Sequence, residues 1–578
     1  MLKKILSCLG PYKKYVLLTP LFMIAEVLLE VFIPMLMSKM IDIGIPLGQN
    51  GDMSYIVKTG IMMIVMAVLS LGAGVLAGRC SSIAGAGLAK GVRGKLFRKI
   101  QDFSFSNIDK FSTSSLVTRL TTDVTNTQNA FTMTIRIAAR APFMLISAIC
   151  MAVAINKELS LIFIVAIPIL AAAIGIILSL AYPRFQIMLK KYDKLNAKIQ
   201  ENLIGIRVVK AFVRGDYENE KFQFSADEVR RAQIRAERIV IFNMPIMQLL
   251  MYGCMIAVSW LGGNLIISGN MLTGELMSFI SYISQILMSL MMIAMVFMMI
   301  VMSRASISRI VEVFDEQSDI TDHDGEDILL KDGSVKFENV TFSYYRTAEE
   351  PTLNNINLEI ASGETVGIIG GTGSAKSTLV QLIPRLYDTT QGKVIVGGHD
   401  VRDYKLDTLR NNVAMVLQKN VLFSGTIKEN LKWGNENATD TEIIEACEAA
   451  DAHGFITSFP DGYETDLGQG GVNVSGGQKQ RLCIARALLK KPQIIILDDS
   501  TSAVDTATDS KIRTAFREKL ADTTTIIIAQ RVSSVSDADK IIVMDDGKIN
   551  AVGTHDELLA SNEIYREVYE SQQKGGEQ

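Results

Sequence analysis

The sequence of 578 residues has few of the residues that build metal or disulfide sites. Its six cysteines are scattered without a CxxC pair, and it has only four histidines. This excludes a disulfide scaffold and leaves no thiolate zinc or iron–sulfur site to propose. Charged residues make up only 21%, with a net charge of −3, so nothing favours nucleic-acid binding. The mean hydropathy of +0.25 instead indicates a membrane protein with a sizeable soluble part.

Long apolar runs fill the first half of the chain. Between Arg238 and Arg304 the only charged residue is Glu275, which lies in a polar turn. Each side of that turn exceeds the roughly 20 apolar residues that cross a bilayer. Runs of similar composition occur earlier, at 16–37, 56–77, 138–155 and 159–181. The sequence therefore predicts six spanning helices.

Lysine and arginine are concentrated at the N-terminus and in two long connections, 79–137 and 182–239. The positive-inside rule predicts that both termini and these connections lie in the cytoplasm. The connections have helical spacing without Gly/Pro clusters, so we expect them to extend the spanning helices into the cytoplasm. The first apolar run is full length and is followed by no small-residue cleavage site, so we expect no cleaved signal peptide.

The composition changes after Arg304. An acidic stretch suggests a linker over 316–334, and from Val335 short β-branched strands alternate with charged helices. That alternation is typical of a parallel sheet with crossover helices. We therefore predict a membrane α-helical bundle over 1–315, with cytoplasmic extensions, and an α/β domain over 335–578.

A glycine-rich segment follows the apolar strand predicted at 365–369. Strand, loop and helix in this order are the context of a P-loop, whose backbone N–H groups surround phosphate oxygens. We assign Lys376 to the β- and γ-phosphates and Ser377 to Mg²⁺, which makes ATP and Mg²⁺ the expected cofactors. Ala375 stands where the pattern has glycine, so the tightness of binding is left open. The segment consists of Gly370, Gly371, Thr372, Gly373, Ser374, Ala375, Lys376, Ser377 and Thr378.

Two further motifs follow in the α/β domain. A buried strand predicted at 494–497 ends in Asp498, the Walker B arrangement that holds Mg²⁺. Ahead of it, a signature motif opens a predicted helix. The signature is formed by Val474, Ser475, Gly476, Gly477 and Gln478. With this motif the chain resembles the ATP-binding-cassette (ABC) exporters over essentially its whole length, as a half-transporter.

The resemblance implies further residues of the nucleotide site. It assigns Tyr344 to stacking on adenine, Gln418 to the Mg²⁺ ion, Asp505 to the loop after Walker B, and a switch position to Gln530. It also implies two cassettes that bind two ATP molecules head to tail, each between one P-loop and the other chain's signature. Coupling helices that transmit cassette closure to the membrane are expected near 103–110 and 212–221.

Two catalytic positions depart from the family pattern. The residue after the Walker B aspartate is normally glutamate, and here Asp499 is one methylene shorter. The switch residue is normally histidine, and Gln530 cannot take up a proton. Loss of a positioned base typically costs about 10²–10⁴-fold in rate. The chain therefore resembles the degenerate-site subunit of heterodimeric bacterial multidrug exporters, with a second, homologous half-transporter as its partner.

Two other interpretations stay open. One is an ATP-gated or regulatory membrane module that switches without pumping. The other is a slow homodimeric exporter of peptide or lipid that uses Asp499 as its base. In the favoured interpretation the protein exports small amphipathic compounds. It is then a multi-pass protein of the plasma membrane, in contact with the lipid bilayer. The resemblance implies that this membrane is the bacterial cytoplasmic membrane. No nucleic-acid partner is expected.

Charged residues inside the first and third spans are candidates for the substrate pathway. Glu26 and Glu30 lie one helical turn apart, where charge is costly. They either attract cationic substrates or are partnered within the bundle, and the sequence does not decide between the two. Arg136 and Arg140 open the third span, and we expect their side chains to snorkel toward the cytoplasmic interface.

The sixth predicted span carries methionines at helical spacing. Most of them share one helical face, and methionine suits surfaces that accept varied apolar shapes. They either line a pathway or pack against lipid and neighbouring helices, and packing is the simpler explanation. The candidate pathway residues on this face are Met291, Met295 and Met298.

Overall fold

The computed structural model describes residues 1–322, 327–344, 350–499 and 506–576. They form two compact units. The helical unit comprises Met1–Gln101 and Thr113–Glu316, and the α/β unit comprises Asp102–Ser112 and Gln317–Gln578. The short segment 102–112 therefore packs with the α/β unit, although it lies between two parts of the helical unit along the chain.

The helical unit contains six helical stretches long and apolar enough to cross a membrane, which confirms the six predicted spans. The stretches are Leu2–Gln49, Ser54–Gln101, Thr113–Ile155, Lys157–Ile204, Gly215–Ile267 and Thr273–Asp315. Their helices are α1 (Leu2–Leu6), α2 (Lys13–Lys39), α3 (Ile45–Gln49), α4 (Ser54–Gln101), α6 (Thr113–Thr118), α7 (Val124–Ile155), α8 (Lys157–Ile204), α10 (Gly215–Val240), α11 (Asn243–Ile267) and α12 (Thr273–Asp315). Shorter segments are η1 (Ser7–Tyr12), η2 (Met40–Gly44) and η3 (Arg119–Asp123).

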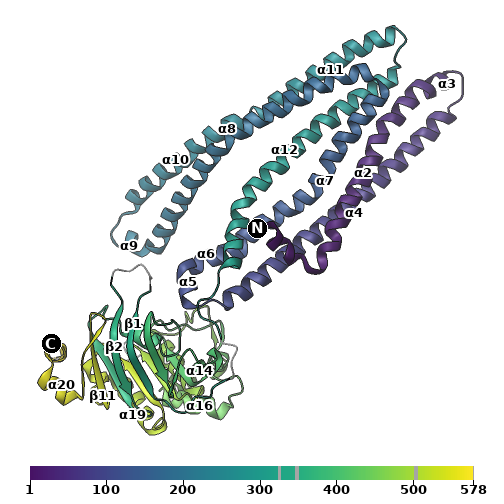
Figure 1. Ribbon diagram of the computed structural model, residues 1–578. Coiled ribbons are helices and arrows are strands. Elements are labelled where there is room, and N and C mark those ends of the chain that lie inside the picture. The colour runs from purple at the N-terminus through teal and green to yellow at the C-terminus, as the bar shows by residue number, and fades with distance from the viewer. Residues whose placement is uncertain (323–326, 345–349, 500–505, 577–578) are drawn as a thin grey trace. The chain divides into compact units, whose positions relative to one another are not determined.

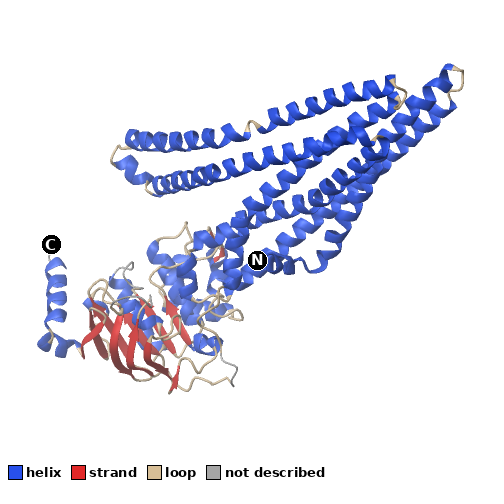
Figure 2. Ribbon diagram, turned by 45° about the horizontal axis from the view of Figure 1, so that its top comes forward, coloured by secondary structure: helices blue, strands red, loops and turns tan. Residues whose placement is uncertain are grey.

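Within the helical unit, α2 packs against α4 and α7, α7 packs against α12, and α8 packs against α10 and α11 (Figure 1). Figure 2 distinguishes the helices of this unit from the strands of the α/β unit by colour. Phe163 of α8 stacks on Phe279 of α12 with ring centroids 5.5 Å apart. The buried Tyr282 hydroxyl donates to the Val31 carbonyl oxygen at 2.8 Å. Such partners matter because lipid offers none to a polar group at membrane depth.

Small residues on α4 allow its neighbours to approach closely. A methyl group on Gly85 would lie 2.0 Å from the Thr132 hydroxyl oxygen of α7, and one on Gly91 would lie 2.0 Å from the Cys8 carbonyl oxygen. In lipid there is no hydrophobic driving force between helices, and close van der Waals packing takes its place. Small residues at helix contacts allow that packing. These glycines therefore set the spacing of α4 from α7 and from η1.

Among its described residues, the α/β unit contains a six-stranded sheet in the order β12-β11-β3-β10-β9-β6, a four-stranded sheet in the order β2-β1-β4-β5, and a separate pair of β7 and β8. The first is parallel apart from the β11–β12 pair, and the second is antiparallel. The strands are β1 (Val335–Phe342), β2 (Leu353–Ile360), β3 (Thr365–Gly370), β4 (Gln391–Val396), β5 (His399–Asp400), β6 (Val413–Val416), β7 (Gly425–Thr426), β8 (Asp466–Leu467), β9 (Ile494–Asp498), β10 (Thr524–Ile528), β11 (Lys540–Asp545) and β12 (Lys548–Gly553).

The antiparallel sheet was not part of the prediction, and its strands differ in burial from the parallel ones. All of β9 and β10 is buried, as expected for strands covered on both faces, whereas β1 and β2 largely alternate buried and exposed positions. The helices of the unit are α5 (Phe105–Phe111), α13 (Lys376–Gln381), α14 (Leu406–Asn412), α15 (Ile427–Leu431), α16 (Asp440–Ala449), α17 (His453–Thr457), α18 (Gly476–Leu489), α19 (Thr506–Lys519), α20 (His555–Ser561) and α21 (Glu563–Gly576), with the short turns η4 (Gly462–Glu464) and η5 (Val532–Ser534).

The two segments expected to be coupling helices differ in how they fold. The first, 103–110, coincides with α5, which Ser104 caps together with Asn107. In the second connection the short helix is α9 (Ile206–Ala211), ahead of the expected 212–221. A turn with Val213 at φ 53° ends α9. Residues 215–221 instead begin α10, whose acidic first turn suits a helix N-terminus.

Candidate nucleotide site

The sequence-predicted site residues of the P-loop, Walker B and switch motifs gather at one edge of the parallel sheet. The P-loop follows β3, Asp498 ends β9, and Gln530 follows β10. Strand β10 lies between β3 and β9 in the sheet, so the carboxyl ends of three adjacent strands carry these groups. The crevice outside the carboxyl ends of parallel strands is where α/β folds bind ligands.

The P-loop backbone explains both its glycines and its one departure from the pattern. Gly370 has φ 156°, and a methyl group there would lie 2.2 Å from the Met544 carbonyl oxygen. Ala375, which stands where the pattern has glycine, adopts the left-handed conformation with φ 67° and ψ 24°. This conformation costs a residue with a Cβ about 1–2 kcal/mol. The loop therefore has the backbone conformation that the glycine pattern requires, but Ala375 adopts it with strain.

Changing Ala375 to glycine is expected to stabilise the protein. Relief of the left-handed strain, about 1–2 kcal/mol, exceeds the extra flexibility that glycine gives the unfolded chain, about 0.4–1 kcal/mol. Thermal unfolding of the full chain should show a midpoint about 1–3 °C higher. Ala485, inside α18, is the matched control, because Ala485→Gly should lower the midpoint. A lower midpoint for Ala375→Gly would contradict the strain argument.

Lys376 closes over the P-loop. Its Nζ donates to the Gly370 carbonyl at 2.9 Å and to the Gly371 carbonyl at 2.7 Å, and lies 3.3 Å from the Ser374 hydroxyl. Burial lowers the pKa of Lys376, and the nearby carboxylates of Asp499 and Asp498 oppose that shift. The ammonium group thus sits at the mouth of the loop, where a phosphate oxygen could replace the backbone carbonyls as its partner.

Ser377 and Asp498 supply neighbouring oxygen donors. The Ser377 hydroxyl donates to Asp498 Oδ1 at 2.8 Å. Burial raises the pKa of Asp498, which the Ser377 hydrogen bond partly offsets. A hydroxyl and a single carboxylate fit Mg²⁺, which commonly completes its octahedron with phosphate oxygens and water. Ser377 and Asp498 would hold that ion, which supplies charge for the phosphates when bound.

Two amide side chains converge on Asp499. The Gln530 Nε2 donates to Asp499 Oδ2 at 2.7 Å, and the Gln418 Nε2 lies 3.4 Å from the same oxygen. The Asp499 backbone N–H donates to the Ile528 carbonyl at 3.1 Å, with φ at 48°. Neither amide can accept a proton from a water molecule or carry positive charge. The structure thus brings together the two positions that depart from the family pattern.

Tyr344 follows β1 and lies beside the start of α13. Its hydroxyl is 3.0 Å from Thr378 Oγ1, and its ring packs edge-to-face on Phe342 and Tyr387, with centroids 4.9 and 5.2 Å apart. Burial raises the pKa of Tyr344. Tyr344 is still 42% exposed, which leaves room for a base to stack. Tyr387 was not singled out from the sequence, because it belongs to no motif recognised there.

The signature motif forms the start of α18. Ser475 caps the helix by accepting from the Gln478 backbone N–H at 3.3 Å, and the Gln478 side chain accepts from the Ser475 N–H at 2.9 Å. Ser475 and Gly476 are exposed, whereas Val474 is buried. The N-terminus of α18, which favours anions, is thus exposed to solvent. Asp505, the predicted residue of the loop after Walker B, lies outside the described residues.

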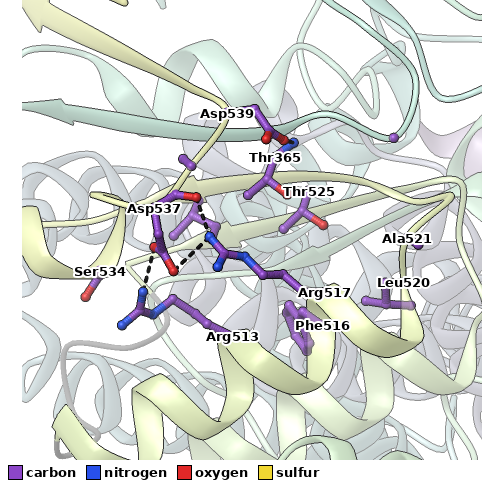
Figure 3. Close-up of a pocket in the computed structure, with 13 residues that line it drawn as sticks. Thr365, Arg513, Phe516, Arg517, Leu520, Ala521, Thr525, Ser534, Asp537 and Asp539 are labelled. Carbon is purple, nitrogen blue, oxygen red and sulfur yellow. Dashed lines mark hydrogen bonds and ion pairs between the residues drawn. The ribbon is translucent and has the colours of Figure 1, made fainter. Parts of the chain in front are cut away.

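A separate pocket of about 260 Å³ lies at the opposite, amino edge of β3 and β10 (Figure 3). Arg513 and Arg517 of α19 line it and both pair with Asp537, at 2.7 and 2.8 Å. None of the predicted site residues is among its lining residues. The pocket is therefore distinct from the nucleotide edge.

The acidic pair in the first span is partnered. Arg140 of α7 pairs with Glu26 and, at 2.8 Å, with Glu30, both on α2. The expectation that Arg140 snorkels to the interface is therefore wrong, because the carboxylates satisfy its guanidinium within the bundle. One Glu26 oxygen, Oε2, is buried and has no hydrogen-bond partner among the described residues. Two carboxylates share one guanidinium, so the cluster carries a net charge of about −1 when all three are ionised.

The candidate methionines of α12 differ in exposure. Met295 is 62% exposed, and Met291 and Met298 are partly exposed. Met288, two turns before Met295, is also exposed. The face they share is therefore not filled by the helical unit itself. Lipid, a second chain or a cavity can all cover such a face.

Comparisons with known proteins cover both units. Residues 16–312 match the family model for the ABC transporter transmembrane region, and residues 353–502 match the ABC transporter model. The chain is 39% identical to the uncharacterized ABC transporter ATP-binding protein YfiB of Bacillus subtilis, over 99% of this chain and 98% of that protein. It is 32% identical to the putative multidrug export ATP-binding/permease protein YgaD of the same organism, over 98% of each chain.

A more distant relative and a solved structure extend this picture. The ATP-dependent lipid A-core flippase of Syntrophus aciditrophicus is 32% identical over 85% of this chain and 82% of that protein. The fold matches the structure of a bacterial Atm1-family ABC exporter with ATP bound, with a TM-score of 0.81 and 24% identity over 97% and 98% of the two chains. Because family models match both units and relatives align over nearly the whole length, the protein belongs to the ABC transporters, as a multi-pass half-transporter whose α/β unit is a transport ATPase.

Proposed function

We propose that this chain is the slow-site subunit of a heterodimeric ABC exporter. The observation that carries the proposal is the contact between Asp499 and Gln530, at 2.7 Å. Asp499 stands where the family has glutamate, and Gln530, whose amide donates to it, stands where the family has histidine. A site without its positioned base typically loses about 10²–10⁴-fold in rate. The chain's own site then binds ATP and hydrolyses it slowly.

The intact signature gives this chain a second task. Ser475 and Gly476 are exposed at the start of α18, a helix of 14 residues. In the head-to-tail arrangement of the family they face the nucleotide held by the partner's P-loop. The helix N-terminus favours the charge on that nucleotide. The partner is a homologous half-transporter with its own glutamate and histidine. Hydrolysis at the partner's site then sets the ATPase rate of the complex.

The slow site should remain loaded with ATP over several turnovers. Lys376, Ser377 and Tyr344 retain the contacts for phosphate, Mg²⁺ and adenine, while Asp499 and Gln530 slow hydrolysis. Nucleotide trapped on the purified complex during turnover and then analysed by mass should include about one unhydrolysed ATP per heterodimer. Lys376→Ala is the control that should empty this site. An empty site in the unmodified protein would refute this part of the proposal.

Substrate and orientation follow from the same proposal. Two relatives are named for multidrug export and for lipid A-core flipping, which supports amphipathic, lipophilic compounds as substrates. The lysine-rich N-terminus and connections support cytoplasmic termini, in a bacterial cytoplasmic membrane. Glu26, Glu30 and the exposed methionine face of α12 are the proposed pathway residues.

Single replacements on the α12 methionine face should change the order in which dyes are transported. Met291, Met295 and Met298 are each replaced by alanine and by tryptophan, and the transport of several unrelated dyes into inverted vesicles is measured. Each dye contacts a different subset of flexible thioethers, so relative rates shift. Met23, fully buried on α2, is the control whose replacement should lower all rates together. Uniform loss at all four positions would mean that the face only packs.

A further inference from the structure

Tyr387 touches both the proposed adenine position and α5. Its ring meets the Tyr344 ring edge-to-face, with centroids 5.2 Å apart and planes at 90°. On another side it meets Phe105 of α5, at 6.0 Å and 60°. Its hydroxyl donates to Asp109 Oδ2 of α5 at 2.8 Å. All four residues belong to the α/β unit, so one side chain joins the nucleotide site to α5.

The hydroxyl of Tyr387 is a permanent donor. Burial and the neighbouring Asp109 carboxylate both raise the pKa of Tyr387. The phenol therefore stays protonated at neutral pH, and a hydrogen bond to an ionised acceptor is among the stronger kinds. Phe342 supports the same ring from β1, at 5.6 Å. Contacts with Phe342, Tyr344 and α5 therefore set the orientation of the Tyr387 ring together, so a change at one of them affects the others.

Tyr344 is placed to change when a nucleotide arrives. Its hydroxyl lies 3.0 Å from Thr378 Oγ1, directly after the proposed Mg²⁺ ligand Ser377. Part of its ring is exposed for a purine to stack on. Edge-to-face contacts depend on the mutual angle of the two rings. A purine that fixes the Tyr344 ring therefore also restricts Tyr387, and through its hydroxyl Asp109.

A different anchor holds the beginning of α5. The Ser106 hydroxyl donates to Asp319 Oδ2 at 2.8 Å, and Ser104 donates to the same carboxylate. This anchor runs to the segment ahead of β1 and not to the loop after α13. The Asp319 anchor thus holds α5 to the segment ahead of β1, whereas the Tyr387 anchor leads from α5 to the nucleotide site.

We propose that Tyr387 is the positioning residue through which a nucleotide stacked on Tyr344 sets the position of α5. The proposal rests on the proposed nucleotide site and adds a route by which its occupancy reaches α5. The hydroxyl of Tyr387, not the bulk of its ring, carries the effect to Asp109.

Hydrogen exchange of the full chain in lipid nanodiscs, with and without Mg²⁺ and ATP, tests the proposal. Tyr387→Phe and Ser106→Ala are matched variants, because each removes one 2.8 Å hydrogen bond between α5 and the rest of the unit. ATP should slow exchange in the P-loop of all three proteins. In α5 it should change exchange by about 3–10-fold in the unmodified chain and in Ser106→Ala, but by less than about 1.5-fold in Tyr387→Phe.

ATP affinity is measured in parallel and should stay within about twofold in Tyr387→Phe. If Tyr387→Phe misfolds, Asp109→Asn removes the same charged acceptor and should give the same result. An α5 response that survives in Tyr387→Phe overturns the inference, and so does equal loss in both variants, since α5 then needs only to be docked. Absence of ATP binding and P-loop protection in the unmodified chain would instead refute the proposed nucleotide site.

Discussion

Changing Gly477 to aspartate is expected to abolish most of the ATPase activity of the assembled exporter, whereas Asp499→Asn should change it by less than about twofold. Gly477 lies in the first turn of α18, where a carboxylate would repel the nucleotide held by the partner's P-loop. Asp499 belongs to the slow site, which contributes little to turnover. Steady-state ATPase of the co-purified complex in nanodiscs, at saturating ATP, measures both effects.

Ser475→Ala provides a graded companion to that experiment. It removes the Ser475 hydroxyl, which belongs to the signature and also caps α18. Loss of such a cap costs about 1 kcal/mol of stability. Activity should again fall steeply without loss of assembly, which gel filtration of the complex checks. Should Asp499→Asn prove as damaging as the signature variants, the chain works as a homodimer with Asp499 as base, and the heterodimer account is wrong.

Replacing Arg140 by leucine is expected to destabilise the protein by about 3–5 kcal/mol. The change leaves the carboxylates of Glu26 and Glu30 one helical turn apart without their shared cation. At membrane depth such uncompensated charge is costly. Denaturant unfolding of the purified chain in detergent measures the loss.

Glu30→Gln is the matched control for Arg140. It leaves a balanced pair of Glu26 and Arg140 and removes the more exposed of the two carboxylates, so stability should change by less than about 1 kcal/mol. If Arg140→Leu is as stable as the unmodified chain, the ion pairs of Arg140 do not stabilise the bundle and this prediction is wrong.

Much of the fold was predictable because its signals are local. Six apolar runs are each long enough to cross a bilayer, and recognising them needs no knowledge of their neighbours. The order of β2-β1-β4-β5 was not predictable, since antiparallel partners are chosen by contacts distant in sequence. The short helix of the second connection was displaced to Ile206–Ala211 for a similar reason: helix ends depend on single turn residues such as Val213.

The candidate site shows the same division. The P-loop, Asp498 and Gln530 could be expected to meet, because each follows a parallel strand at the same sheet edge. The left-handed backbone of Ala375 and the second amide on Asp499, from Gln418, could not be read from the motifs. The prediction for Arg140 was wrong because its partners lie on another helix, more than a hundred positions earlier. The sequence of one span does not show which other helix packs against it.

The assignment of α5 to the α/β unit has a practical consequence for fragments of this protein. The chain crosses between the units after Gln101, after Ser112 and after Glu316, so the ATPase portion is a discontinuous domain. A fragment that starts at the linker would lack Asn107 and Phe111, which are buried in the protein. It would also remove the contacts that Tyr387 and Asp319 make with residues 104–109. Soluble fragments should therefore be assembled with residues 102–112 supplied as a tethered or separate peptide.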